Sequence, residues 1–422
     1  MTITDPSRIA RAQATNRLQA IGALFSDGCA RIGSHPLAAI ICIGFALRCF
    51  WWMTHPVSNS PDAMLYLKEA DNLFSTGRIE SNVCMPLYPI LIHLAGENGI
   101  ILLQIALSTA SIYLAYRIAC DVWSSKSAGV VAAILMAAHP MLIYYLAFRL
   151  TETVFIFFVL LGFAALYRDR IAGAALAFTL ANLLRPSLDL VVPAILVAGT
   201  FATVAKPTLR ELARRLAVYA LIYGTLMSAW WLHNYEKYHR FVRLDLGAGM
   251  TMIYENNQQF EQYGFDAAKL TPWVPFAQIA DPVEQDAAMQ SAAIAYIKTR
   301  PLAWLRGDLD RATRFFTPSD LSYSRLQKFF SALILIATVA GALASLALVP
   351  GWRRRVPLWL PVVFLTALHL SFHALPRYRL PLDPLLIVLA SGSLAAWQRR
   401  IGGMVNKHIV VPAGQGRYQS AQ

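Results

Sequence analysis

About ten long apolar stretches constrain this chain more than any other feature of its sequence. They cover approximately residues 36–53, 99–120, 127–147, 150–167, 171–185, 187–204, 216–234, 329–349, 357–375 and 380–397. A helix of roughly 20 apolar residues crosses the hydrocarbon core of a bilayer. Apolar residues make up 57% of the 422 residues and charged residues only 14%, which leaves too little polar surface for several soluble domains. We therefore predict an all-α, polytopic membrane protein with about ten transmembrane helices.

The distribution of Lys and Arg sets the predicted orientation. With the N-terminus in the cytoplasm, about half of the 37 Lys and Arg residues fall in inside segments, and only a few fall in short outside loops. Positive residues concentrate in cytoplasmic loops, so we predict that both termini are cytoplasmic. The same bias, together with anionic lipid, explains the net charge of +13, and nucleic acid is not an expected partner.

Two outside segments are too polar to span a membrane. The first, 54–98, contains an amphipathic helical stretch that ends near Phe74, and the second, 235–328, is larger and mostly helical. Within the second, Asp281 to Glu284 form a capping box. It predicts a helix that ends near Thr299, and a second helix follows with an apolar stripe that could rest on the membrane.

The stretch at 127–147 is interrupted by His139-Pro140, so its second part is expected to be a short re-entrant piece.

The spans and loops divide the chain into five regions. The regions are a cytoplasmic amphipathic segment 1–35, a transmembrane catalytic module 36–234 that includes loop 54–98, the external helical loop 235–328, C-terminal transmembrane helices 329–397 and a cytoplasmic tail 398–422.

Two external carboxylates are candidates for chemistry. Asp62 follows the first span in the phrase Ser60-Pro61-Asp62, and the alternative is that it is only a helix N-cap. Glu152 lies at the external mouth of the fourth span, next to a long apolar run. Its alternative role is an interfacial salt bridge to Arg149.

Basic residues gather at the same predicted membrane face. Arg48 lies just inside the outer end of the first span, where a charge needs an anionic partner. Arg377 and Arg379 form a pair that suits phosphate oxygens. His369 and His373 are four residues apart and share one helix face, so metal binding and ordinary packing are both open for them.

In the order and placement of several short phrases, the chain resembles the polytopic GT-C glycosyltransferases. Within this class it resembles the bacterial relatives of dolichyl-phosphate-mannose protein mannosyltransferase and of the lipid A aminoarabinose transferase. The matching phrases are Asp62 with Tyr66 and Ala70, Pro86-Leu87-Tyr88-Pro89, Pro140 followed by Leu150-Thr151-Glu152, Leu184-Arg185-Pro186, Trp231-Leu232-His233-Asn234-Tyr235 with Gly247 beyond, and Arg377-Tyr378-Arg379-Leu380-Pro381.

The resemblance implies a GT-C-like fold and a sugar transfer at the outer face of a bacterial inner membrane. The donor would be a polyprenyl-phosphate-linked sugar, and the acceptor a hydroxyl of an envelope glycan, lipid or protein. Asp62 would be the general base. Many relatives have a second acid directly after it, whereas this chain has Ala63, so Glu152 is the candidate for that role. A departure also occurs at His233, where relatives usually have Arg.

The remaining site residues are assigned from the chemistry of the reaction. A departing lipid phosphate gains charge, and arginines can stabilise it. The candidates for this phosphate are Arg377, Arg379, Arg48 and Arg78, with Arg185 as a weaker one. The candidates for substrate contact are Tyr66, Tyr88, His373 and Tyr378. No cofactor is certain, but a divalent cation is open, with Glu152, His369 and His373 as its candidate ligands.

Two other classes of function share a basic external mouth. One is a lipid or glycan transporter or flippase, and the other is a non-catalytic subunit of an envelope assembly. A transporter would have ionisable groups near the bilayer midplane and repeated halves. This sequence has few such groups and no visible repeat, which favours the transferase.

Overall fold

The computed structural model describes residues 36–55, 57, 60–266, 268–318, 324–348 and 351–409. The predicted amphipathic segment 1–35 and the end of the predicted tail, 410–422, lie outside the described residues. All described elements are helical. They are α2 (Pro36–Thr54), α3 (Pro61–Thr76), α4 (Leu87–Trp123), α5 (Lys126–Ala138), α6 (Pro140–Tyr144), η1 (Tyr145–Ala147), α7 (Glu152–Leu166), α8 (Ile171–Asn182), η2 (Pro186–Leu188), α9 (Val192–Thr203), α10 (Leu209–Tyr238), α11 (Ala248–Glu255), α12 (Gln258–Tyr263), η3 (Val274–Phe276), α13 (Pro282–Thr299), α14 (Pro301–Phe315), α15 (Arg325–Leu348), η4 (Trp352–Arg354), α16 (Val356–Ser371), α17 (Pro376–Arg379) and α18 (Asp383–Ile409).

Each predicted span coincides with a helix or with a bent pair of helices. By length and composition, α2, α4, α10 and α15 can each cross a membrane. Helix α5 and the α6–η1 segment are bent by 51°, so the predicted break at His139-Pro140 is confirmed. The other predicted spans correspond to the shorter apolar helices α7, α8, α9, α16 and the first part of α18.

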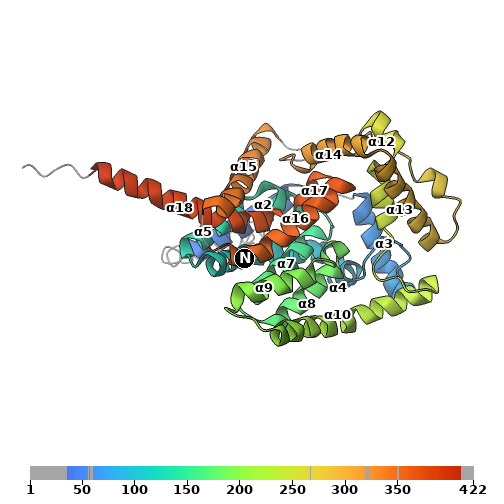
Figure 1. Ribbon diagram of the computed structural model, residues 1–422, viewed down its shortest axis with the longest axis horizontal. Helices are drawn as coiled ribbons and strands as arrows, with labels where there is room; N and C mark the ends of the chain where they lie inside the picture. Colours follow the sequence, from blue (N-terminus) through green and yellow to red (C-terminus); the bar gives the residue numbers. More distant parts are fainter. Residues whose placement is uncertain are drawn as a thin grey trace, which may run out of the picture.

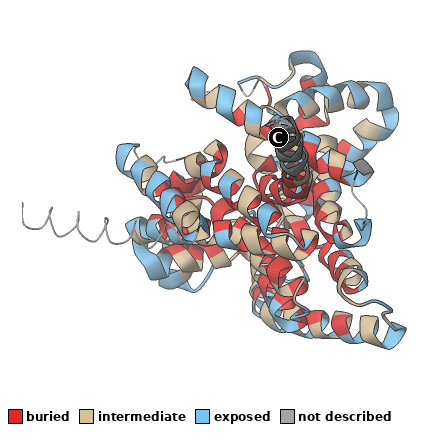
Figure 2. Cartoon of the chain, turned by 90° about the vertical axis from the view of Figure 1, so that its left-hand side faces the viewer, coloured by how far each residue is buried: buried red, intermediate tan, exposed pale blue. Residues whose placement is uncertain are grey.

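The surface of the bundle is apolar where it would meet lipid. Phe50 on α2, Leu221 on α10 and Ile336 on α15 are each more than half exposed. Exposed apolar surface on this scale is rare in soluble monomers. Buried residues instead gather along the centre of the bundle, as Figure 2 shows. The outer helical faces therefore suit a bilayer.

The helices form a bundle with a helical region at one end. Helix α4 packs on α5 and α7, α15 packs on α18, α8 packs on α7 and α10, and α9 packs on α16. In Figure 1, α3 and α12 to α14 lie together at the right-hand end, away from the bulk of the bundle. The two loops predicted to be external therefore meet on the same side of the molecule.

The capping box of the larger loop is confirmed in its main feature. Asp281 Oδ1 accepts hydrogen bonds from the backbone N–H groups of Val283 and Glu284, at 2.8 and 3.2 Å. The helix it begins, α13, ends at Thr299, and Pro301 begins α14. Leu302, Leu305 and Leu309 on α14 are mostly exposed, as the predicted apolar stripe requires.

Arg48 is a structural residue and does not line the candidate site. Its side chain is fully buried, and it donates to Ser108 Oγ at 2.8 Å, Met136 O at 3.1 Å and Ala137 O at 3.3 Å. Those carbonyls belong to the last turn of α5, which lacks helical partners for them. A cation at a helix C-terminus also suits the helix dipole. Its assignment to a donor phosphate is therefore corrected.

Replacing Arg48 tests this structural role. Arg48→Met keeps the bulk of the side chain but leaves Met136 O, Ala137 O and Ser108 without their donor. Loss of such buried partners costs about 1–3 kcal/mol for each group, so the apparent unfolding temperature in detergent should fall clearly. A thermal scan checks this, and a variant as stable as the wild type would contradict the role.

Candidate functional site

Four charged side chains from distant parts of the chain meet at the loop-bearing end of the bundle. Arg377 Nη2 donates to Asp62 Oδ2 at 2.6 Å, and Arg377 Nε lies 3.2 Å from Glu152 Oε1. Arg185 Nη1 donates to the same Glu152 oxygen at 2.5 Å. Asp62, Glu152, Arg185 and Arg377 thus form one connected group, which we call the charged cluster.

Local structure leaves the Asp62 carboxylate available. Ser60 is the N-cap of α3, and its hydroxyl accepts from the N–H of Ala63 at 3.2 Å. Pro61 occupies the first helical position, where a missing N–H costs nothing, and Asp62 follows in the first turn. The alternative that Asp62 is the cap is therefore wrong. Its side chain is 45% exposed, so a molecule from outside can reach it.

Glu152 is the buried centre of the charged cluster. It is the first residue of α7, where the helix dipole favours a negative charge. Its side chain is only 3% exposed and its Oε2 atom has no hydrogen-bond partner among the described residues. The alternative of an ion pair with Arg149 is wrong, because Arg149 instead binds Glu97, through the backbone O at 3.1 Å and the carboxylate at 3.4 Å.

The carboxylates keep both guanidinium groups of the charged cluster charged. Burial alone would lower the pKa of Arg377, but Glu152 and then Asp62 raise it above its ordinary value. Arg185 likewise donates to Glu152, whose negative charge favours the charged guanidinium. Each arginine side chain is still 19% exposed, so a bound anion can contact either one without first breaking the fold.

Aromatic rings border the charged cluster. The Tyr378 ring lies 5.4 Å from the Arg377 guanidinium carbon and 5.6 Å from that of Arg185, a cation–π arrangement that holds both planes. Tyr66 packs edge-on to Tyr88, with ring centroids 5.1 Å apart. Burial raises the pKa of Tyr66, so its hydroxyl stays protonated at neutral pH. Tyr66 and Tyr378 thus lie beside the charged cluster, and their contact with substrate stays a prediction.

Tyr88 lies one layer deeper than we predicted. Its side chain is fully buried, and its hydroxyl donates to Gln104 Oε1 at 2.5 Å. Gln104 in turn donates to Leu146 O at 2.7 Å and Phe148 O at 2.9 Å. Tyr88 therefore supports Tyr66 from behind and ties α4 to the segment before α7. Direct contact between Tyr88 and substrate is corrected to this supporting role.

The large external loop holds the chain that leads to Arg377. Helix α16 ends at Ser371, and its last carbonyls need partners. Trp304 and Asn256 each donate to Ser371 O at 3.2 Å, Arg311 donates to Leu370 O, and Arg314 donates to Ala374 O at 2.8 Å. Side chains of α11 and α14 and their junctions thus fix residues 370–374, immediately before α17.

A buried carboxylate, Glu255, holds this loop together and pairs with one of the predicted site residues, His373. Glu255, at the end of α11, binds Arg314 through both oxygens, at 3.0 and 2.5 Å. It also pairs with the ring of His373. Despite its burial, these two partners lower the pKa of Glu255. His373 is therefore held by the external loop, and its predicted contact with substrate stays a prediction.

Arg379 and Arg78 do not join the charged cluster. Arg379 is 1% exposed and donates to Asp383 at 3.0 Å, to Phe315 O at 2.7 Å and to Thr317 O at 2.9 Å. Its donors are used within the fold, so its assignment to phosphate is corrected. Arg78 is exposed in the loop after α3, and its side chain forms no hydrogen bond or ion pair with the described residues.

The proposed metal ligands are not brought together. Glu152 faces two arginines, His373 faces Glu255, and the ring of His369 stacks on Tyr378 with centroids 5.0 Å apart. Within the part of the chain that is described, no group of three His, Cys, Asp or Glu side chains could hold a metal ion. Two guanidinium groups also repel a cation. These residues do not fit a metal.

Sequence reasoning underrated Arg185 and did not consider Asp245, whose raised pKa alone does not make it part of the charged cluster. Arg185 precedes η2 in an extended conformation and donates into the charged cluster. Asp245, in the segment between α10 and α11, has its pKa raised to about 6 by burial, while Gly247 N–H and the charge of Arg185 counteract that rise. The Arg-Pro pair at 185–186 was the available sequence signal for Arg185. Asp245 carries no local motif.

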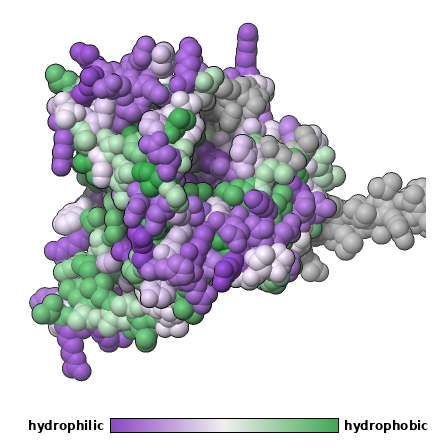
Figure 3. Space-filling view, turned by 90° about the vertical axis from the view of Figure 1, so that its right-hand side faces the viewer, coloured by the Kyte–Doolittle hydropathy of each residue, from purple (hydrophilic) through white to green (hydrophobic). Residues whose placement is uncertain are grey.

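Figure 3, which faces the right-hand side of Figure 1, shows polar surface with apolar areas beside it. No family model matches the chain, and a search of curated proteins finds no match. Among solved structures, the chain is similar to the archaeal oligosaccharyltransferase AglB from Archaeoglobus fulgidus in complex with an inhibitory peptide and a dolichol-phosphate. The TM-score is 0.56 at 11% identity, over 92% of this chain and 53% of that one.

Two further structures are similar. The apo oligosaccharyltransferase of Archaeoglobus fulgidus gives a TM-score of 0.55 at 12% identity, over 91% of this chain and 53% of that one. ArnT from Cupriavidus metallidurans bound to undecaprenyl phosphate gives 0.41 at 16% identity, over 89% and 80%. The chain thus spans about half the length of the archaeal enzymes. At these identities the likeness concerns the fold, and it confirms the predicted class: the chain has the all-α, polytopic membrane fold of the GT-C glycosyltransferases.

Proposed function

We propose that this protein is a membrane glycosyltransferase that moves a sugar from a polyprenyl-phosphate donor to a hydroxyl group. The acceptor would be an envelope glycan, lipid or protein, and the reaction would invert the anomeric centre. One observation carries the proposal. The exposed carboxylate of Asp62 lies 2.6 Å from the guanidinium group of Arg377, which also pairs with the buried carboxylate of Glu152. This arrangement puts a general base directly beside a group that can bind phosphate.

Arg377 and Arg185 are the phosphate-binding residues in this proposal. Both are anchored on one oxygen of Glu152, so their positions are set before any ligand arrives. Guanidinium groups bind phosphate oxygens by paired, charge-assisted hydrogen bonds. Preorganised cations of this kind stabilise the charge that develops on a leaving phosphate. Glu152 is therefore assigned as a positioning residue, because only 3% of its side chain is exposed.

Asp62 is the general base. A donor phosphate on Arg377 competes with Asp62 for the guanidinium and frees the carboxylate to accept a proton. The acceptor hydroxyl then loses its proton to Asp62 while its oxygen forms a bond to the anomeric carbon. The bond between that carbon and the phosphate oxygen breaks, and its electron pair leaves with the polyprenyl phosphate. A single displacement of this kind inverts the centre.

The nature of the carrier and the side of the membrane are part of the proposal. The AglB structure that shares the fold holds a dolichol-phosphate, which supports a lipid phosphate as the leaving group. The Lys and Arg distribution supports cytoplasmic termini, and the charged cluster lies at the opposite, outer face of a bacterial inner membrane. Membrane lipids would surround the bundle, and the donor tail would lie between its helices.

Removing the base tests the reaction. In cells that lack the protein, we expect one sugar mass to be missing from envelope glycans and glycolipids, and wild type to restore it. Asp62→Asn should lower transfer by about 100-fold or more, because general-base catalysis contributes on that scale. Asp71→Asn is the matched control, since Asp71 is an exposed acid on the same helix. Mass spectrometry of the envelope provides the readout.

Two outcomes would refute the assignment of Asp62. The first is full restoration of the sugar by Asp62→Asn at normal protein levels. The second is an equal loss with Asp71→Asn, which would indicate damage to α3 rather than loss of a base. A complete absence of glycan changes in the deleted strain would favour the transporter or the assembly subunit.

Replacing the bridging arginine tests phosphate binding separately from chemistry. Arg377→Gln should weaken binding of undecaprenyl phosphate to the purified protein by about tenfold, because a charge-assisted pair to phosphate is lost. Arg306→Gln, at an exposed position on α14, removes the same charge elsewhere on this face and should leave binding unchanged. Equal binding by Arg377→Gln and wild type would place the phosphate elsewhere.

A further inference from the structure

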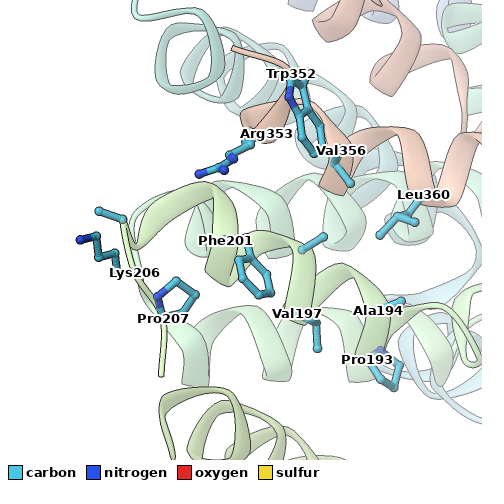
Figure 4. A pocket seen from close by; sticks show the side chains of 12 residues that line it. Pro193, Ala194, Val197, Phe201, Lys206, Pro207, Trp352, Arg353, Val356 and Leu360 are labelled. Atoms are coloured by element: carbon cyan, nitrogen blue, oxygen red, sulfur yellow. The ribbon is translucent and has the colours of Figure 1, made fainter. Parts of the chain in front are cut away.

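A groove lies on the bundle, away from the charged cluster. An apolar groove of about 940 Å³ runs between α9 and α16. Its walls include Pro193, Val197 and Phe201 of α9, and Val356 and Leu360 of α16 (Figure 4). The volume is within the range of pockets that hold small ligands. None of the residues assigned to the proposed reaction lines it.

Two cations mark one end of this groove. Lys206 follows α9, and Arg353 lies in η4, just before α16. In Figure 4 both side chains lie at the same end, whereas Pro193, Ala194 and Leu360 lie toward the other. Both cations are exposed, and neither forms an ion pair or a side-chain hydrogen bond with any described residue. The groove is thus amphipathic along its length: apolar for most of it and positive at one mouth.

The position of the cations separates this groove from the donor site. Arg185 precedes α9 in the chain, whereas Lys206 follows it. The 12 residues of α9 span about 18 Å at 1.5 Å per residue. A phosphate on Arg185 and Arg377 therefore cannot also contact Lys206. The Lys and Arg distribution that orients the chain puts Lys206 and Arg353 on the cytoplasmic side.

We propose that this groove binds a bilayer phospholipid with an anionic headgroup. The headgroup phosphate would lie between Lys206 and Arg353, and an acyl chain would follow Phe201 and Val197 along α9. Apolar walls alone would not select such a lipid, since every acyl chain in the bilayer suits them. Selection comes from the two unpaired cations, because basic pockets between helices on the cytoplasmic side favour anionic headgroups.

Binding of two lipids with identical acyl chains tests the proposal. Purified protein is titrated with phosphatidylglycerol or with phosphatidylcholine, and bound lipid is counted by native mass spectrometry. We expect the wild type to bind one phosphatidylglycerol at least tenfold more tightly than phosphatidylcholine. The double variant Lys206→Gln/Arg353→Gln should lose that preference. Arg210→Gln, an exposed cation at the start of α10 on the same side, is the matched control and should keep it.

A second variant tests the groove itself. Ala198→Phe adds bulk to the wall of the groove and should weaken both lipids. Bromine-labelled phosphatidylglycerol should also quench the fluorescence of Trp352, which lines the groove. The quenched component is the difference between wild type and Trp352→Phe.

Three results would overturn the proposal. The first is an unchanged preference in the double variant. The second is an equal loss with Arg210→Gln, which would show a general effect of charge. The third is displacement of phosphatidylglycerol by a lower concentration of undecaprenyl phosphate in wild type but not in the double variant, which would make the groove a carrier-lipid site. None of these results bears on Asp62 or Arg377, so the proposed reaction stands or fails separately.

Discussion

A buried carboxylate at the start of α7 sets the arrangement of this end of the molecule. An isolated charge in an apolar bundle is strongly unfavourable, and removing a partner from a buried pair is costly. Glu152 therefore needs the guanidinium groups of Arg185 and Arg377. These come from the segment after α8 and from α17, and Arg377 extends the connection to Asp62 on α3. The ion pairs that surround this one carboxylate thus hold four distant segments together.

The external loop also helps to fix the position of Arg377. The last carbonyls of α16 point at side chains of α11 and α14, and Glu255 binds the arginine and histidine that complete this contact. The chain between α16 and α17 is therefore held from outside, while Arg379 anchors α17 from inside through Asp383. Arg377 sits between these two anchors, so its position depends on both the bundle and the loop.

Local patterns were sufficient for the spans, for the break at Pro140 and for the cap at Asp281, because each depends on residues close together in sequence. Partners that lie tens to hundreds of residues apart were not predictable. The sequence offered the nearby Arg149 as the alternative partner of Glu152, but Glu152 pairs with Arg185 and Arg377. Arg48 donates to buried carbonyls, but the sequence alone does not distinguish such a structural arginine from one that binds a ligand. Only its surroundings separate the two.

The central claim is that Arg377 carries a lipid phosphate beside Asp62. A structure of the protein in lipid nanodiscs with undecaprenyl phosphate bound tests it most directly. The account predicts the phosphate within hydrogen-bonding distance of Arg377 and Arg185, with Asp62 released from its ion pair and facing the solvent. A phosphate bound elsewhere, with the pair between Asp62 and Arg377 intact, would contradict it.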